Sequence, residues 1–165
     1  MTNVIMNNTR QSIAALLLRL SLGAGFIAHG LAKITRGPAG FEKLLRFEGV
    51  PFAHINALVA PYVELAGGGA LVLGLYVTVS AIPLLATMLV ATVFVQGHYG
   101  FSSVKTMGLT PEGPVFGPPG WEINLLYMTG LLALMLLGEG KYFSLRRLRI
   151  RKKSSTFIQD QTRPD

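Results

Sequence analysis

Glu64 is the only charged residue between positions 57 and 95, in a stretch of aliphatic, small and hydroxyl side chains. As one continuous helix this stretch would be roughly 58 Å long, nearly twice the ~30 Å hydrocarbon core of a bilayer. We therefore expect two membrane spans joined by a tight turn, with Glu64 inside the membrane. An ionisable side chain there costs about 2.5–3.5 kcal/mol or more, so a functional role is the first hypothesis. A buried carboxylate of this kind is suited to accept a proton from a bound molecule.

Seven further polar side chains are expected near Glu64. A helix over residues 12–34 places three of them within an arc of about 100°, and this face should point inward because a polar stripe facing lipid is costly. The other four lie at the end of a span over 81–96 and at the start of one over 121–138, on the outer side of the membrane. Glu64 itself should lie roughly 10 Å below that surface. The sequence predicts an outer-leaflet cluster in which Glu64 and His29 are the candidate catalytic residues, and the candidate ligand-binding residues are Arg19, Lys33, Gln96, His98, Glu122 and Asn124.

Simpler roles stay open for these residues. Glu64 could form a structural ion pair with a cation of the first span and so fix the register of two helices. Lys33, His98 and Glu122 are also suited to the membrane boundary, and a carboxylate favours a helix N-terminus. His29 is more often a hydrogen-bonded core residue than a ligand. Histidines and carboxylates together can bind a metal ion, but no tight ligand spacing is present and no metal is predicted.

Transmembrane helices are expected to carry these polar side chains. Of the 165 residues, 50% are hydrophobic and 14% are charged, whereas a soluble domain has about 25% charged residues. Apolar runs predict an all-α fold, a four-helix transmembrane bundle that forms a single domain over residues 1–145, with spans at about 12–34, 57–76, 81–96 and 121–138.

Two connecting segments have a distinct composition. Between the first two spans, Phe41, Leu44, Leu45 and Phe47 alternate helically with charged residues, which predicts a short interfacial helix. A Gly/Pro-rich outer loop over residues 97–120 joins spans three and four, and we expect it to fold over the helix ends as a lid.

The basic residues predict the orientation of the chain in the membrane, and the cysteine content limits its redox chemistry. Seven basic residues lie within positions 141–153, so the tail over 146–165 is expected in the cytoplasm, and four spans place the N-terminus there too. Residues 146–153 should bind anionic lipid head groups, since no nucleic-acid-binding fold precedes them. The chain has no cysteine, which excludes disulfides, thiol relays and cysteine-ligated iron–sulfur clusters. No cofactor motif is present in the chain itself.

Several short motifs follow one another in a set order. They are Arg19, His29-Gly30-Leu31-Ala32-Lys33, Gly49-Val50-Pro51, Glu64-Leu65-Ala66-Gly67-Gly68, Gly120-Trp121-Glu122, Gly138-Glu139-Gly140 and Ser144-Leu145. In this order, over about residues 14–145, they resemble the pattern of the DoxX family of bacterial four-helix membrane proteins. The resemblance implies the fold. The family takes its name from a subunit associated with a terminal quinol oxidase, and other members resemble quinone-facing subunits or associate with redox-defence proteins.

The resemblance and the polar cluster together predict an accessory subunit of a quinone-linked redox or oxidative-stress system in the bacterial cytoplasmic (inner) membrane. A quinone or quinol is the expected ligand, and redox subunits are the expected partners. A homo-oligomer and a catalytic activity of its own both stay open. Two alternatives use the same residues: a small-solute transporter or binding module, and a structural partner subunit without a ligand.

Overall fold

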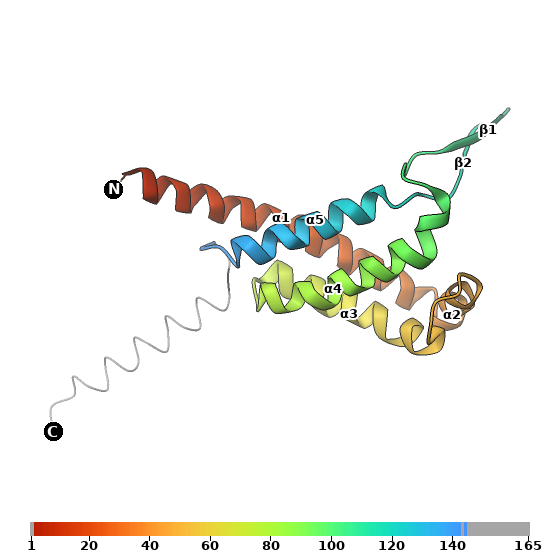
Figure 1. Cartoon of the computed structure of the whole chain (residues 1–165), viewed down its shortest axis with the longest axis horizontal. Helices are drawn as coiled ribbons and strands as arrows, with labels where there is room; N and C mark the ends of the chain where they lie inside the picture. The colour runs from red at the N-terminus through yellow and green to blue at the C-terminus, as the bar shows by residue number, and fades with distance from the viewer. Residues whose placement is uncertain (1, 143, 145–165) are drawn as a thin grey trace, which may run out of the picture.

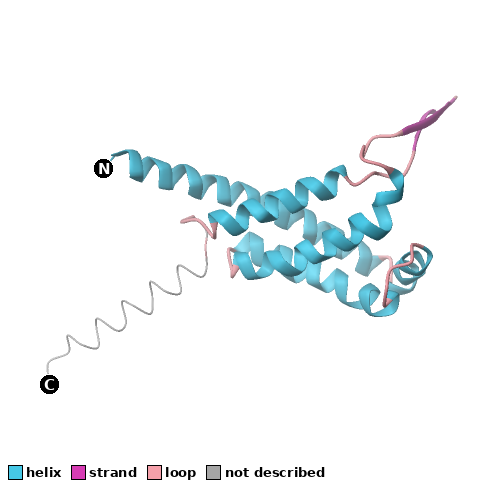
Figure 2. Cartoon of the chain, viewed as in Figure 1, coloured by secondary structure: helices cyan, strands magenta, loops and turns pink. Residues whose placement is uncertain are grey.

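The computed structural model describes residues 2–142 and 144 and is mostly helical (Figures 1 and 2). The longer helices lie side by side, and the short helix α2 (Pro38–Phe47) and a β-hairpin are at one end of them (Figure 1). The predicted basic tail over 146–165 lies outside the described residues. In chain order the elements are α1 (Thr2–Thr35), α2 (Pro38–Phe47), α3 (Ala53–Leu73), α4 (Val77–Val90), a π-helix (Ala91–Gln96), a 3₁₀ turn (Gly97–Tyr99), β1 (Thr106–Thr110), β2 (Gly113–Phe116) and α5 (Glu122–Leu137).

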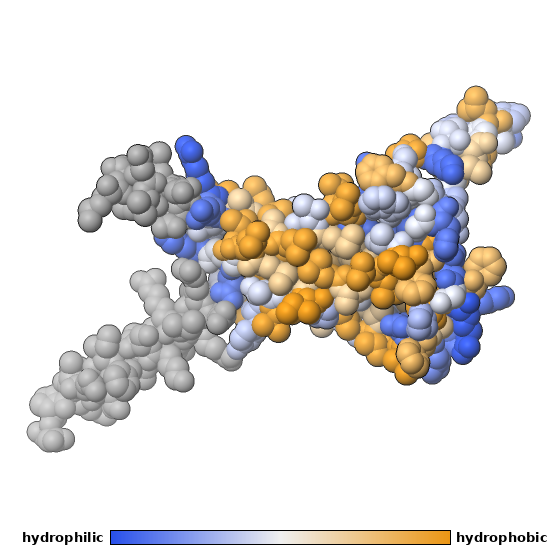
Figure 3. All heavy atoms as spheres, viewed as in Figure 1, coloured by the Kyte–Doolittle hydropathy of each residue, from blue (hydrophilic) through white to orange (hydrophobic). Residues whose placement is uncertain are grey.

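Three helical segments are long and apolar enough to cross a membrane: Thr9–Thr35, Ala53–Leu73 and Val77–Tyr99. The fourth apolar helix, α5, has 16 residues and is therefore only about 24 Å long. Apolar side chains cover the middle of the helices, and hydrophilic ones gather at the end that carries α2 (Figure 3). The expected membrane protein is therefore confirmed, with three spans of full length and one shorter apolar helix.

Helices α1 and α3 cross closely because glycines lie between them. A Cβ atom on Gly23 would lie 2.7 Å from the Gly68 carbonyl oxygen, and one on Gly68 would lie 2.8 Å from that of Gly23. A Cβ on Gly30 would meet the backbone of α3 in the same way, 2.7 Å from the Pro61 oxygen. Small residues allow such approach in lipid, where packing rather than hydrophobic burial drives helix association. The second residue of the His-Gly motif and the last glycine of the Glu-x-x-Gly-Gly motif thus have a packing role.

The turn between α3 and α4 lies earlier than expected. The sequence predicts it near residues 77–80, with Pro83 in the first turn of the next span, but α3 ends at Leu73 and α4 begins at Val77. Gly74, at φ 64°, caps α3 in the left-handed conformation that glycine adopts readily. Pro83 lies inside α4, where a membrane helix tolerates proline because its surroundings satisfy the freed carbonyl.

The segment after α1 contains a helix at the expected place. Proline at N1 starts α2 without losing a helical hydrogen bond, and Leu45 buries its side chain against α3. On the exposed side, the Glu42 carboxylate accepts hydrogen bonds from His54 Nδ1 at 2.7 Å and from Arg46 at 2.7 and 2.8 Å. The hydrogen bond with His54, followed by that with Arg46, lowers the pKa of Glu42. These contacts fix α2 to the start of α3.

The outer segment over 97–120 differs from the expected lid. Helical structure continues through Tyr99, and β1 and β2 pair as an antiparallel hairpin. The hairpin projects away from the helix ends rather than folding over them (Figure 1). At its base, the amides of Gly120 and Trp121 donate to the oxygens of Ser102 and Gly100, at 3.0 and 3.1 Å. These hydrogen bonds hold the base of the hairpin and leave its far part without cover.

Candidate functional site

Lys33 and Glu64 form an ion pair between α1 and α3. Lys33 Nζ lies 2.5 Å from Glu64 Oε1, and the same ammonium lies 5.0 Å from the centre of the Phe41 ring of α2. The Lys33 side chain is 27% exposed and that of Glu64 is 1% exposed. Lysine can extend its charge inward from the end of α1 along an apolar stem. The pair therefore joins three elements around a carboxylate that is almost completely buried.

The second oxygen of this carboxylate has no partner. Glu64 Oε2 is buried and makes no hydrogen bond within the described residues. Because an ionised carboxylate can accept about four hydrogen bonds, and a buried acceptor without a donor costs about 1–3 kcal/mol or more, such an atom calls for an explanation. Glu64 also lies near the middle of its helix, about 16 Å from the first residue of α3 and about 14 Å from the last. It is thus deeper than expected, because α3 begins four residues earlier than the predicted span.

A partly open cavity of about 330 Å³ lies against Glu64. It is lined from α1, α2, α3, α4, the π-helix and α5, and most of its wall is apolar. This size and character are typical of a small-molecule site with a few polar groups. Helix α2 closes part of it through Phe41, Leu44 and Leu45, whereas no residue of the segment over 97–120 lines it. The polar lining residues are His29, Lys33, Asn56, Glu64, Thr87, Gln96 and Asn124.

An amide pair from α5 and the π-helix faces the same cavity. Asn124, which is 5% exposed, donates through Nδ2 to Gln96 Oε1 and, at 3.1 Å, to Thr92 Oγ1. Thr92 Oγ1 in turn donates to the Met88 carbonyl at 2.8 Å. The wider π-helical turn occurs at these residues, and such turns are often found in functional sites. The hydrogen bonds orient the Gln96 and Asn124 amides as fixed parts of the cavity wall.

His29 lines the cavity and stacks against an aromatic side chain of α5. The His29 and Tyr127 rings are 5.8 Å apart with 19° between their planes, and the Phe26 ring packs edge-on against Tyr127 at 5.1 Å. A Cβ on Gly25 would collide with the Tyr127 hydroxyl. These contacts bring α5 against α1 beside the cavity and fix the plane of the imidazole.

Arg19 lies at the opposite end of α1 from this cluster. Its side chain is completely buried and donates to four backbone oxygens: those of Leu71 at 2.8 Å, Val72 at 2.9 Å, Glu139 at 2.7 Å and Tyr142 at 3.1 Å. The rise along α1 predicts Arg19 as the deepest member of the cluster, and ten residues, or about 15 Å, separate it from His29. The expected place of Arg19 in the ligand-binding cluster is thus corrected to one at the C-terminal ends of α3 and α5.

His98 and Glu122 also lie outside the cavity lining. The ring of His98 contacts the Phe94 oxygen at 3.0 Å and the Glu48 carboxylate at 3.9 Å. Glu122 accepts a hydrogen bond from the Ser103 amide at 2.9 Å. Glu122 is in the first turn of α5, where a side chain points back toward the preceding segment, and His98 lies in the 3₁₀ turn after the π-helix. The structure therefore does not bring these two predicted ligand-binding residues to Glu64.

Five of the eight candidate residues, then, meet around one cavity: His29, Lys33, Glu64, Gln96 and Asn124. Asn56, Thr87 and Thr92 were not predicted, since single amides and hydroxyls in apolar helices give little signal. The spacing of Met88, Thr92 and Gln96, four residues apart along α4 and the π-helix, is the one pattern that could have indicated that Thr92 and Gln96 share a face. Within residues 2–142 and 144, no group of three or more histidines and carboxylates could hold a metal ion.

Comparison with known proteins agrees with the resemblance found in the sequence. The family model described as DoxX matches residues 14–97, which include both members of the ion pair. An uncharacterized membrane protein of Mycobacterium tuberculosis (strain ATCC 25618 / H37Rv) is 29% identical over 145 residues, covering 82% of this chain and 81% of that protein. No solved structure matches the chain. Because the family model covers more than half of a chain that has several membrane-spanning helices, the protein is a multi-pass membrane protein that belongs to the DoxX family.

Proposed function

We propose that this protein is an accessory subunit of a quinone-linked redox or oxidative-stress system, and that its cavity binds the head group of a quinone or quinol. The observation that carries the proposal is buried Glu64, which lines a cavity of about 330 Å³ and whose oxygen Oε2 has no partner among the described residues. A quinol presents a hydroxyl group that can donate to this oxygen. The apolar walls suit the remainder of a ring, and the mid-membrane position suits a lipid-soluble molecule.

Each polar residue of the cavity has a role in this proposal. Glu64 accepts the hydrogen bond and, on oxidation of a quinol, the proton that must leave. Lys33 compensates the charge of the carboxylate, and His29 lies where it can pass a proton onward. Gln96 and Asn124 orient the head group from the opposite wall. Electrons must leave through a partner subunit, because the chain has no cysteine and carries no cofactor motif.

The cavity argues against a purely structural role for the polar residues. Packing that served only to join helices would fill this space with side chains, since protein interiors leave few voids larger than a water molecule. A small-solute binding module or transporter would also use a cavity, and we treat it as an outcome of the experiment.

We further propose a four-helix bundle in the inner membrane with both termini in the cytoplasm. Arg19 and Ser144 support it, because their hydrogen bonds join the end of α5 to the turn between α3 and α4; Ser144 Oγ donates to the Gly74 oxygen at 3.1 Å. The C-terminal end of α5 is thus on the side opposite α2. Residues 146–153 would then lie at the inner surface, where basic side chains attract anionic lipids.

The test is purification of the protein from native membranes in mild detergent, followed by identification of bound small molecules and proteins. We expect a bound quinone or quinol and redox subunits with the wild-type protein, and loss of the small molecule with Glu64→Gln. Glu112→Gln is the matched control, because Glu112 is exposed at the hairpin, outside the cavity lining. A non-quinone solute bound in the same Glu64-dependent way would instead support the binding module, and recovery of no small molecule would support the structural subunit.

A further inference from the structure

We infer that the cavity is selective for the reduced form of its ligand: it binds a neutral ring with hydroxyl groups more tightly than the same ring with carbonyl groups. This inference rests on the proposed function, which by itself leaves the redox state of the ligand open. It follows from the hydrogen-bond donors and acceptors that the cavity wall leaves unused.

The Glu64 carboxylate beside the cavity can act only as an acceptor when it is ionised. Lys33 Nζ donates to Glu64 Oε1, while Glu64 Oε2 is buried without a partner among the described residues. A hydroxyl group of a quinol can donate to Oε2. A quinone oxygen in that place is itself only an acceptor, so two lone pairs would face each other and Oε2 would stay without a donor. Hydrogen bonds to charged groups are stronger than neutral ones, which makes this difference large.

The opposite wall presents both a donor and an acceptor. Asn124 Nδ2 uses its two hydrogens on Thr92 Oγ1 and Gln96 Oε1. The Gln96 Nε2 hydrogens and the Asn124 Oδ1 oxygen are therefore left for a ligand among the described residues. A hydroxyl group can donate and accept, and so can satisfy either amide atom, whereas a carbonyl can satisfy only Gln96 Nε2. Both walls thus favour the hydroxyl form, although only the Glu64 wall excludes the carbonyl.

Charge narrows the ligand class further. The Lys33–Glu64 pair has no net charge when both groups are ionised, and Lys33 already uses one donor on the carboxylate. An anion at Oε2 would meet a negative oxygen in a setting of low dielectric, where like charges repel strongly. The preferred ligand is therefore uncharged, with hydrogen-bond donors at the end that meets α3.

Such selectivity has a consequence for the bound couple. Tighter binding of the reduced form makes the bound quinone a better oxidant than the free one. For a two-electron couple, a tenfold preference corresponds to a rise of about 30 mV in midpoint potential. The subunit would thus collect reduced quinol from the membrane and release it as quinone once a partner has removed the electrons and protons.

The experiment measures the binding of two redox forms of one probe to the full chain in nanodiscs. The probe is 2-decyl-1,4-benzoquinone, used under anaerobic conditions either oxidised or fully reduced by excess dithionite. We expect the quinol to bind the wild-type protein at least about tenfold more tightly than the quinone. With Glu64→Gln the ratio should fall toward one, because the side-chain amide then places an N–H donor, which a carbonyl and a hydroxyl oxygen can both accept, where the wild type has an acceptor. Glu112→Gln should keep the wild-type ratio.

A second pair of probes tests the donor requirement on the wild-type protein alone, and so does not depend on the folding of a variant. 4-Decylphenol and 1-decyl-4-fluorobenzene have nearly the same shape, but only the phenol has a hydroxyl hydrogen, and the phenol should bind about tenfold more tightly. Equal binding of quinol and quinone would overturn this inference and leave the proposed function standing. Binding of the phenol over the fluorobenzene, with neither quinol nor quinone bound, would overturn the quinone-linked function and keep the donor selectivity. Equal binding within both pairs would reject the selectivity outright.

Discussion

At the scale of single residues, loss of Lys33 and loss of Glu64 should destabilise the protein to different extents, because the two side chains differ in burial. Lys33→Met leaves the Glu64 carboxylate, which is 1% exposed, without its cation. Stranding one buried member of an ion pair typically costs about 3–5 kcal/mol. Glu64→Gln should cost about 1 kcal/mol, because the lysine it leaves can turn its ammonium toward water. The difference can be measured as free energies of unfolding in detergent micelles.

The double variant Lys33→Met with Glu64→Gln is the control for this first prediction. Removing both charges should be less harmful than Lys33→Met alone, since no charge is left unpaired. If Lys33→Met and Glu64→Gln destabilise the protein equally, then Glu64 is reached by water and the account of its burial is wrong.

Arg19 gives a second prediction, which separates structure from ligand binding. Arg19→Lys should lower the free energy of unfolding by about 3 kcal/mol or more, because an ammonium cannot replace the planar set of donors that reaches four carbonyl oxygens. The fraction that still folds should bind the quinol probe with unchanged affinity, measured by titration in nanodiscs. A stable variant with weakened binding would return Arg19 to the ligand site.

At the scale of the elements, the α1–α3 crossing holds Lys33 opposite Glu64, and two adjacent glycines test it. Gly68→Ala places a methyl group 2.8 Å from the Gly23 oxygen, whereas at Gly69 nothing lies within 4 Å. We expect Gly68→Ala to destabilise the protein by about 1–3 kcal/mol through overpacking. Gly69→Ala should stabilise it by about 0.5–1 kcal/mol, because alanine is the better helix former. Thermal unfolding followed by circular dichroism gives both values.

If both alanine variants shift the unfolding temperature in the same direction, the helices are farther apart than the structure has them. A wider crossing of α1 and α3 would also change the site. It would move Lys33 away from Glu64 and leave both carboxylate oxygens of Glu64 without a partner.

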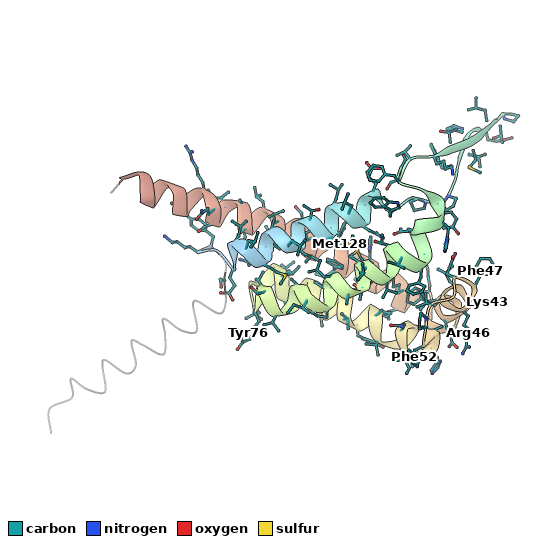
Figure 4. All side chains as sticks on the ribbon, viewed as in Figure 1. Lys43, Arg46, Phe47, Phe52, Tyr76 and Met128 are labelled. Atoms are coloured by element: carbon teal, nitrogen blue, oxygen red, sulfur yellow. The ribbon has the colours of Figure 1, made fainter. Side chains whose placement is uncertain are left out.

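At the scale of the whole molecule, exposed aromatic residues lie at the two ends of α3. Phe52 precedes the helix and Tyr76 follows it, and they lie at opposite ends of the bundle (Figure 4). Both have positive φ, 51° and 45°, and both are exposed, 79% and 56%. Aromatic side chains favour the membrane interface, so the two residues fit the two boundaries of a bilayer. Helix α5, with 16 residues, is shorter than α3, with 21 residues. A thinner bilayer or flanking residues can accommodate a helix of this length.

The topology gives a fourth prediction, which the cysteine-free sequence makes simple to test. In Glu112→Cys, at the exposed hairpin, the thiol should react with a membrane-impermeant maleimide on intact cells. In Lys141→Cys, after α5, it should react only after the inner membrane is opened. Labelling of both from the outside would mean that α5 does not cross the membrane, and labelling of Lys141→Cys alone would reverse the orientation.

The class of protein, its family and the central residue could be predicted from the sequence. A long apolar stretch with one carboxylate can be accommodated only in membrane helices, and the cost of burying Glu64 there is enough to predict a cationic partner on α1. The helical alternation of apolar and charged residues after the first span predicted α2. The ordered motifs indicated the DoxX family. These features follow from local composition and from the spacing of residues along a helix.

Which polar residues meet depends on how the helices pack. Arg19 shares a face of α1 with His29 and Lys33 but lies beside the ends of α3 and α5, and spacing along α1 does not say which elements reach it there. Helix α3 runs from Ala53 to Leu73, and these bounds place Glu64 near the middle of the helix. The free oxygen of Glu64, the cavity beside it and the outward course of the hairpin arise from contacts between segments far apart in the chain. No pattern within one segment encodes such contacts, because each depends on how neighbouring helices pack.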